Sequence, residues 1–394
     1  MPPSTTQTRD VLALTLIPGL GPMLVARLLH ALGDAKAVLN ASHAQLIQIP
    51  RLGDKTAREI IAARRDVDQR VDEELDAVEQ AGARIVAIHE DEYPALLRSI
   101  PDPPPLLYVR GRFDHQADQY PIAIVGSRKC SHYGVEQSER FGGILARAGL
   151  TIISGGARGI DTAAHRGALR HGGRTIAVLG CGLSSPYPPE NRELFDQIVA
   201  EDLGAIVSEL PMRTSPESKN FPSRNRIISG MSLGVLVIEA GLKSGALITA
   251  RLAAEDHNRD VMALPGRVDA EASRGSNDLI KSGGAALVTE PADVIAVLES
   301  AARHAHFGTH EVRFATGRND AEPSLLVEPP PQAAPLVSEA QRKILDAIGD
   351  GATPDQISDA TGIPPGQLRA EITLLEVAGR VRRMGGLLTA AKSR

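Results

Sequence analysis

The sequence predicts an α/β protein with a Rossmann-like, doubly wound and mainly parallel sheet. A small helical domain is expected before this sheet and a winged helix after it. Three observations predict this organisation: apolar runs alternate with helical patterns between residues 121 and 289, a helical pattern is repeated before residue 65, and three amphipathic segments with a hairpin pattern end the chain. With 394 residues the chain is too long for one core, so several domains are expected.

The first 75 residues contain a weak internal repeat. The segment "LIPGLGPMLVARLLHAL" (16–32) is echoed by "QIPRLGDKTAREIIAAR" (48–64). Each copy predicts a helix, a tight glycine turn and a second helix, which is typical of helix-hairpin-helix or SAM-like domains. Such a hairpin can offer backbone N–H groups to a phosphate, or the domain can serve packing alone.

Residues 76–300 form the predicted core. A Pro-rich connector (93–111) ends in a short strand, and seven apolar runs with glycine or proline turns follow it. The runs are "PIAIVGSR" (121–128), "LTIISGGARG" (150–159), "RTIAVLGCG" (174–182), "AIVSEL" (205–210), "GVLVIEA" (234–240), "DVMALPG" (260–266) and "AALVT" (285–289). Helices are expected between them, at 133–147, 160–171, 191–201 and 246–257.

The predicted tail follows a flexible linker at 301–335, which contains "EPPPQAAP". His304, His306 and His310 lie in this linker without Cys or acidic partners at fixed spacing, so no metal site is predicted. Residues 336–394 predict three helices and a hairpin with Gly385-Gly386 at its turn, a winged helix. The tail has eight cations and seven anions, and its expected recognition helix contributes Arg369 but also Glu371 and Glu376. A protein-interaction role is therefore favoured over DNA contact.

Composition indicates a globular, cytoplasmic protein. Hydrophobic residues make up 42% and charged residues 23%, no apolar run could span a bilayer, and "MPPSTTQTRD" lacks a signal-peptide pattern. Cys130 and Cys181 are expected to be packed or free thiols. Because the net charge is −5, any nucleic-acid site must be a local patch. One such patch is residues 213–230, with four cations and one anion around Phe221.

Glycine-rich turns end the predicted strands, where ligands of open α/β sheets bind. Glycines, hydroxyl groups and cations at these turns indicate a polyanion. The predicted binding residues are Gly126, Ser127, Arg128, Lys129, Ser154, Gly155, Gly156, Arg158, Lys219, Phe221, Arg224, Asn225, Arg226, Lys243 and Ser244. We expect Phe221 on a loop before a helix, held extended by Pro222 so that its ring can stack on a base. Burial of this ring in the core is the alternative.

Neither a dinucleotide fingerprint nor a Walker motif is present, so no cofactor and no nucleotide hydrolysis are predicted. Asp161, Glu209 and Glu239 end or follow strands, where a hydrolase could use them as acid and base. Their structural alternatives are an N-cap for Asp161 and ion pairs of Glu209 or Glu239 with Arg224 or Arg226. His165 is expected to bridge to Asp161.

The core motifs resemble the DNA-processing protein A (DprA, or Smf) family. The resemblance runs from about Tyr93 to Val288 and includes "IAIVGSRKCSHYG", "ISGGARGIDTAAHRGAL", "FPSRNRIISG" and "VLVIEAGLKSGALITARLA". It implies a dimeric, non-enzymatic protein that binds single-stranded DNA in natural transformation (competence), loads a RecA-type recombinase on it without ATP, and displaces single-strand-binding protein. The alternative is a nucleotide hydrolase similar to phosphoribohydrolases, although "EAGLKSGALIT" lacks their Pro-Gly-Gly-x-Gly-Thr run.

Overall fold

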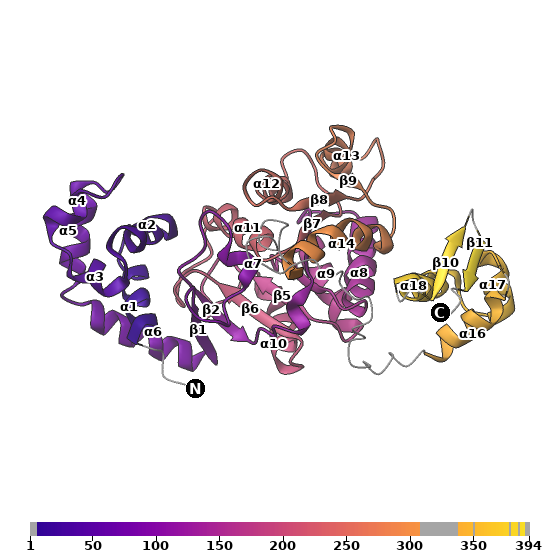
Figure 1. Cartoon of the computed structure of the whole chain (residues 1–394), viewed down its shortest axis with the longest axis horizontal. Coiled ribbons are helices and arrows are strands. Elements are labelled where there is room, and N and C mark those ends of the chain that lie inside the picture. Colours follow the sequence, from indigo (N-terminus) through magenta and orange to yellow (C-terminus); the bar gives the residue numbers. More distant parts are fainter. Residues whose placement is uncertain (1–5, 308–337, 350, 378–379, 385–386, 391–394) are drawn as a thin grey trace, which may run out of the picture. The chain divides into compact units, whose positions relative to one another are not determined.

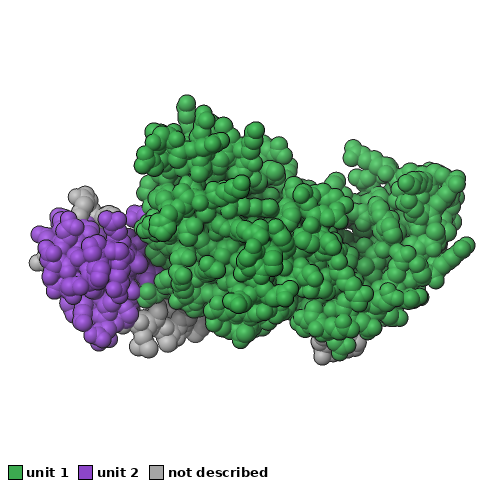
Figure 2. Space-filling model, turned by 180° about the vertical axis from the view of Figure 1, so that it is seen from behind, with its two compact units in different colours: residues 1–289 green, residues 290–394 purple. Residues whose placement is uncertain are grey.

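A computed structural model describes residues 6–307, 338–349, 351–377, 380–384 and 387–390. The chain divides into two compact units, residues 1–289 and residues 290–394 (Figure 2). The first unit contains the helical segment and the large sheet, and the second contains the winged helix. Within the described ranges, no helix is long and apolar enough to cross a membrane.

Nine strands of the described chain form one sheet in the order β1-β2-β6-β5-β4-β3-β7-β8-β9. They are β1 (Ala83–Ala87), β2 (Leu106–Gly111), β3 (Pro121–Val125), β4 (Thr151–Ser154), β5 (Thr175–Val178), β6 (Gly204–Ser208), β7 (Gly234–Val237), β8 (Asp260–Ala263) and β9 (Ala286–Leu287). Strands β3 to β9 pair in parallel, whereas β2 runs antiparallel to β6 and β1 antiparallel to β2. This confirms the doubly wound, mainly parallel prediction. The strand order reverses between β3 and β7.

Helices cover both faces of this sheet (Figure 1). They are α7 (Ala95–Arg98), α8 (His132–Arg147), α9 (Ile160–Arg170), α10 (Arg192–Ala200), α11 (Asn220–Gly230), α12 (Gly245–Arg251) and α13 (Arg274–Lys281), with short 3-10 or π turns at Ala117–Gln119, Pro189–Asn191, Leu252–Asp256 and Glu271–Ser273. Successive side chains of β2 pack into different hydrophobic clusters on the two faces of the sheet: Leu106 and Tyr108 belong to one cluster, and Leu107 and Val109 to another. Both faces are therefore buried, as in parallel sheets.

The predicted repeat forms two helical hairpins. The segment contains α1 (Thr6–Thr15), α2 (Pro22–Leu32), α3 (Ala35–Asn40), α4 (His43–Ile47), α5 (Asp54–Ala63) and α6 (Val67–Gln80). The turn before α2 has Gly19 at φ 83°, and the turn before α5 has Arg51 at φ 65° in the equivalent place. The second copy thus keeps the left-handed turn without its glycine.

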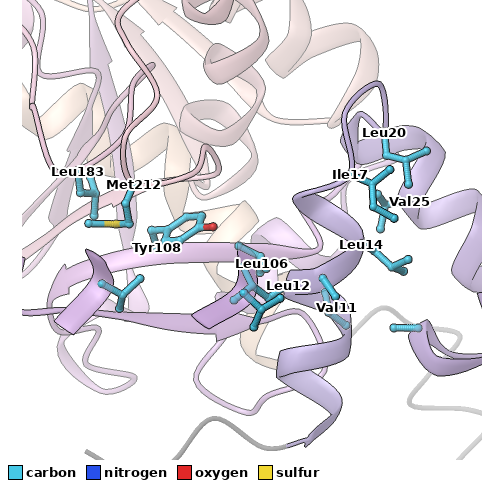
Figure 3. Close-up of a cluster of buried hydrophobic side chains, with 14 of the residues drawn as sticks. Val11, Leu12, Leu14, Ile17, Leu20, Val25, Leu106, Tyr108, Leu183 and Met212 are labelled. Atoms are coloured by element: carbon cyan, nitrogen blue, oxygen red, sulfur yellow. The ribbon is translucent and has the colours of Figure 1, made fainter. Parts of the chain in front are cut away.

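The helical segment and the sheet share one hydrophobic core. Side chains of α1, including Val11 and Leu12, belong to the same buried cluster as Leu106 and Tyr108 of β2 (Figure 3). Glu74 of α6 accepts a hydrogen bond of 2.6 Å from the backbone N–H of Met212. Helix α6 continues to Gln80, so the expected domain border at residue 75 falls inside a helix.

The second unit contains α14 (Pro291–Phe307), α16 (Glu339–Ile348), α17 (Pro354–Thr361), α18 (Pro365–Val377) and the antiparallel strands β10 (Val381–Met384) and β11 (Leu387–Ala390). Ile344, Ile357 and Leu368 belong to a hydrophobic core within this unit. The expected turn at residues 385–386 and His310 lie outside the described residues, and α14 extends past the predicted linker start at 301. Glu371 of α18, the expected recognition helix, is only 5% exposed.

Candidate functional site

A pocket of about 780 Å³ lies at the carboxyl ends of β3 and β7, where the strand order reverses. Ligands of open α/β sheets bind at this switch point. The charged side chains of its wall are Arg128, Lys129, Asp161, Arg224, Lys243, Glu271 and Arg274. Five of these are cations and two are acids, so the pocket is cationic although the chain is not.

The structure brings nine of the predicted residues to this pocket and leaves six outside its wall. The nine are Gly126, Ser127, Arg128, Lys129, Phe221, Arg224, Asn225, Lys243 and Ser244. The six are Ser154, Gly155, Gly156, Arg158, Lys219 and Arg226.

The turn after β3 is held rigidly against its neighbours. The Ser127 N–H donates to the Glu239 carbonyl oxygen at 2.7 Å, and its own carbonyl accepts from the Ile160 N–H at 3.3 Å. A Cβ on Gly126 would lie 2.5 Å from the Ile160 side chain, so only glycine fits this close approach. Arg128 and Lys129 follow on the exposed rim, where their side chains can move to meet an anion.

Phe221 provides an aromatic surface in the pocket wall. Its ring is half-buried and packs beside Gly180, where an added Cβ would lie 3.0 Å from it. The Arg128 guanidinium carbon lies over the ring, 4.6 Å from its centroid, which is a cation–π distance. Neither full burial nor a freely projecting ring describes this side chain.

The backbone around Phe221 differs from the expectation. Helix α11 begins at Asn220, so Phe221 and Pro222 lie in its first turn and not on an extended loop. Proline is tolerated there because the first-turn N–H groups have no partner within the helix. The prediction of an extended Phe221 is therefore wrong, and the helix fixes the ring's position instead.

Arg224 forms part of the pocket floor. Its side chain is buried, and Nη1 donates to the carbonyl oxygens of Gly155 (2.6 Å) and Val178. Within the described chain, its Nε has no hydrogen-bond partner. Burial lowers the pKa of this guanidinium to about 10, although the nearby Asp161 carboxylate opposes the shift. Arg224 therefore joins the ends of β4 and β5 beneath the pocket.

Arg226 lies away from the pocket, in a buried ionic cluster. It pairs with Glu209, and its Nε lies 3.2 Å from Asp102 Oδ2. This confirms the expected alternative of an ion pair with Glu209. Asn225, between the two arginines, does line the pocket, and its Nδ2 donates to the Gly245 carbonyl at 3.3 Å, joining α11 to α12.

The turn after β4 supports the site from behind. The Ser154 hydroxyl is buried and donates to the Ile124 carbonyl at 2.6 Å. The expectation that this hydroxyl binds a ligand is therefore wrong. A Cβ on Gly155 would lie 2.2 Å from Arg224 Nη1. Gly156 has φ 64°, and its carbonyl accepts from Asn191 at 2.9 Å. These residues shape the floor.

Two predicted cations outside the pocket wall are exposed and ion-paired. Arg158 Nη2 lies 2.7 Å from Glu190, and Lys219 Nζ lies 2.7 Å from Glu217. Exposed pairs of this kind contribute little to stability. Both cations therefore remain able to exchange a carboxylate for a phosphate.

The loop after β7 forms the opposite wall of the pocket, and its Lys243 is exposed. Ser244 caps α12, because its hydroxyl accepts from the Ala246 N–H at 3.3 Å. Sequence reasoning missed several residues of this side, among them Leu242, which is 55% exposed, and Glu271 and Arg274 from the segment that opens α13. In the sequence, the only sign that Arg274 could belong to the site is that this cation begins a helix that follows a strand.

The carboxylates that a hydrolase could use have structural partners. Glu239 accepts from the Ser131 N–H (2.7 Å), the Ser131 hydroxyl (2.8 Å) and the Ser273 hydroxyl (3.4 Å). These partners differ from the arginine that the sequence analysis gave as its structural alternative. Asp161 is not an N-cap, because Gly159 holds that position. Asp161 lies in the first turn of α9 and accepts from the Ala157 N–H at 3.3 Å. Burial raises the pKa of the Asp161 carboxyl group.

His165 does not bridge to Asp161. Its Nδ1 lies 2.6 Å from the Thr175 hydroxyl, and burial lowers the pKa of the imidazole to about 3. No acid–base pair is formed with the carboxylates named above. Among the described residues, no group of three or more His, Cys, Asp or Glu side chains could hold a metal ion. Cys130 and Cys181 are free thiols.

Fold and site together define a doubly wound α/β protein with a cationic, partly aromatic pocket at its switch point and a winged-helix unit. Family models agree along the chain. Residues 84–299 match DNA recombination-mediator protein A, residues 328–386 match the DprA winged helix domain, and residues 11–66 match a SAM-like helix-hairpin-helix tandem.

Known proteins give the same result. The chain is 37% identical to "Protein Smf" of Synechocystis, over 95% of this chain and 96% of that one, and 39% identical to "Protein Smf" of Escherichia coli, over 78% of each. The X-ray structure of DNA processing protein A from Streptococcus pneumoniae superposes with a TM-score of 0.63 at 34% identity, covering 73% of this chain and 97% of that one. The chain belongs to the DprA family of DNA-processing proteins.

Proposed function

We propose that this protein binds single-stranded DNA in the pocket between β3 and β7 and loads a RecA-type recombinase on it in natural transformation. The observation that carries the proposal is the combination of a half-buried aromatic ring, Phe221, with the exposed cations Arg128, Lys129 and Lys243 in one pocket. Sequence-tolerant binding of single strands uses such aromatic faces for bases and cations for phosphates.

The position of the ring favours a single strand over a duplex. Phe221 lies in the wall of a pocket, so a base must leave its stack to reach the ring. Reading a duplex would instead require an element that fills a groove. The fixed N–H and carbonyl bonds of the turn after β3 hold the exposed Arg128 beside that ring.

The test is a fluorescence-anisotropy titration of labelled oligothymidylate and of a duplex of equal length, at several salt concentrations. We expect the single strand to bind more tightly. Phe221→Ala should weaken its binding by about tenfold or more, since one stacked base is worth about 1–3 kcal/mol. Arg128→Ala should also lower the salt slope by about 0.7 for each lost phosphate contact.

Arg166→Ala is the matched control, because Arg166 is an exposed cation of α9 outside the pocket wall. It should leave single-strand affinity unchanged. Equal affinity for duplex and single strand, or wild-type affinity in both pocket variants, would contradict the proposed site. A lower melting temperature with unchanged affinity in Phe221→Ala would assign the ring to packing alone.

The recombinase partner, the displacement of single-strand-binding protein, the homodimer and the cytoplasmic location are further parts of the proposal, and family membership supports them. Faster recombinase filament formation on strands coated with single-strand-binding protein is the expected result for the mediator role. An unchanged rate would leave the binding role only.

The hydrolase alternative is not proposed, because Glu239 is committed to Ser131 and Ser273. Release of base from nucleoside monophosphates would revive it.

A further inference from the structure

A second aromatic side chain lies next to Phe221, outside the pocket wall. Tyr187 follows β5, and its ring centroid lies 6.1 Å from that of Phe221, at an interplanar angle of 55°. The Tyr187 ring is half-buried, with one side packed against the hydrophobic core.

Each of the two rings is accompanied by an arginine. The Arg158 guanidinium carbon lies 5.4 Å from the Tyr187 centroid, and its Nη1 donates to the Tyr187 hydroxyl at 3.0 Å. This arrangement parallels Arg128 over Phe221 at 4.6 Å. Successive contacts therefore link the four side chains, from Arg128 through Phe221 and Tyr187 to Arg158.

An arginine beside an aromatic ring matches the two parts of one nucleotide. The ring offers a face to the base, and the exposed guanidinium can turn from the ring to the phosphate. We propose that Tyr187 and Arg158 form a second nucleotide subsite, which binds the base and phosphate adjacent to the nucleotide at Phe221. This inference rests on the proposed single-strand binding.

Glu190 opposes this subsite in the free protein. Its Oε1 lies 2.7 Å from Arg158 Nη2 and 3.3 Å from Nε, and the two side chains are 48% (Arg158) and 60% (Glu190) exposed. A phosphate must displace this carboxylate to bind Arg158. Removing the Glu190 charge should therefore tighten DNA binding, a result that a purely structural role of the pair does not produce.

The experiment measures anisotropy of the full-length protein with labelled oligothymidylates of increasing length, beside each variant's melting temperature. Tyr187→Leu should weaken binding about tenfold on long oligonucleotides. It should have no effect on the shortest length that still binds at Phe221. Tyr187→Phe keeps the ring and should bind within about twofold of wild type. Glu190→Gln should tighten binding severalfold, most strongly at low salt.

Tyr120→Leu is the control, because Tyr120 is 40% exposed at the opposite, amino-terminal edge of the strands. Wild-type affinity in either Tyr187→Leu or Glu190→Gln overturns the subsite, and Glu190→Gln decides alone if Tyr187→Leu does not fold. A wild-type protein that binds no oligothymidylate contradicts the proposed function itself. If Phe221→Ala weakens binding while Tyr187→Leu and Glu190→Gln do not, only the second subsite fails.

Discussion

At the scale of single residues, the pocket combines a buried floor with an exposed rim. Arg224 is held by two backbone carbonyls, and the absence of a side chain on Gly155 makes room for its guanidinium. Arg128 and Lys243, by contrast, are exposed at the rim. Long exposed cations can follow a flexible phosphate chain, whereas buried ones cannot. In the proposed DNA site, the exposed rim supplies the cations that meet phosphates, and the buried floor fixes where those cations lie.

The buried His165 makes stability depend on pH. Its pKa is about 3 in the folded protein because burial disfavours the charged imidazole, against an ordinary value of 6.5. The unfolded chain therefore binds more protons between these two values, so the contribution of His165 is complete above about pH 6.5 and is lost as pH falls. We expect His165 to contribute a slope of up to about 1.4 kcal/mol per pH unit in this window.

Urea unfolding of wild type and His165→Asn between pH 4 and 7 measures this slope. The difference between the two proteins isolates His165 from other titrating groups, including Asp161, whose raised pKa acts in the opposite direction. The variant should lose less stability than wild type as the solution is acidified. Parallel pH profiles would show that the imidazole is not the group responsible.

At the scale of elements, α11 positions the aromatic ring and is itself anchored by a buried ionic cluster. Arg226 joins α11 to Glu209 after β6 and to Asp102. Removing one partner of a buried pair costs about 3–5 kcal/mol, since the other charge stays buried. We expect Arg226→Ala to lose stability of this order in urea unfolding. Single-strand affinity of the folded fraction should change little, because Arg226 does not line the pocket.

The double variant Arg226→Met/Glu209→Leu tests the cause of that loss. Replacing a buried ion pair by apolar side chains is often neutral, so much of the stability should return. The loss in Arg226→Ala should also shrink as pH falls, because burial already raises the Glu209 pKa and a protonated Glu209 needs no cation. An equal loss in single and double variants would exclude an unpaired charge as the reason.

The elements of the sheet could be predicted from sequence because apolar runs alternate with helical patterns and end in glycine turns. The start of α11 could not, since Pro222 is equally compatible with a loop and with the first turn of a helix. Arg274 could not be placed at the pocket either. It lines the same pocket as Gly126 only because β3, β7 and β8 are neighbours, and strand order is a property of the assembled sheet.

At the scale of the whole molecule, the charges are unevenly distributed. The chain carries −5, yet the pocket wall has five cations and two acids. A net negative field does not attract DNA from a distance, so the proposed binding must rely on the pocket and on cations close to it. This explains why composition gave no sign of nucleic acid. The sequence of the winged helix is nearly neutral, so the winged helix does not share the positive charge of the pocket wall.

The pocket wall is formed entirely by residues between 125 and 274, and the winged helix has a hydrophobic core of its own. A protein truncated after Pro335 should therefore bind oligothymidylate with a Kd within about tenfold of wild type, or about 1.4 kcal/mol. Anisotropy titrations at equal salt measure this, with unchanged melting of the remaining chain as the control for folding. A larger loss in a folded truncated protein would mean that the winged helix contributes to the DNA site.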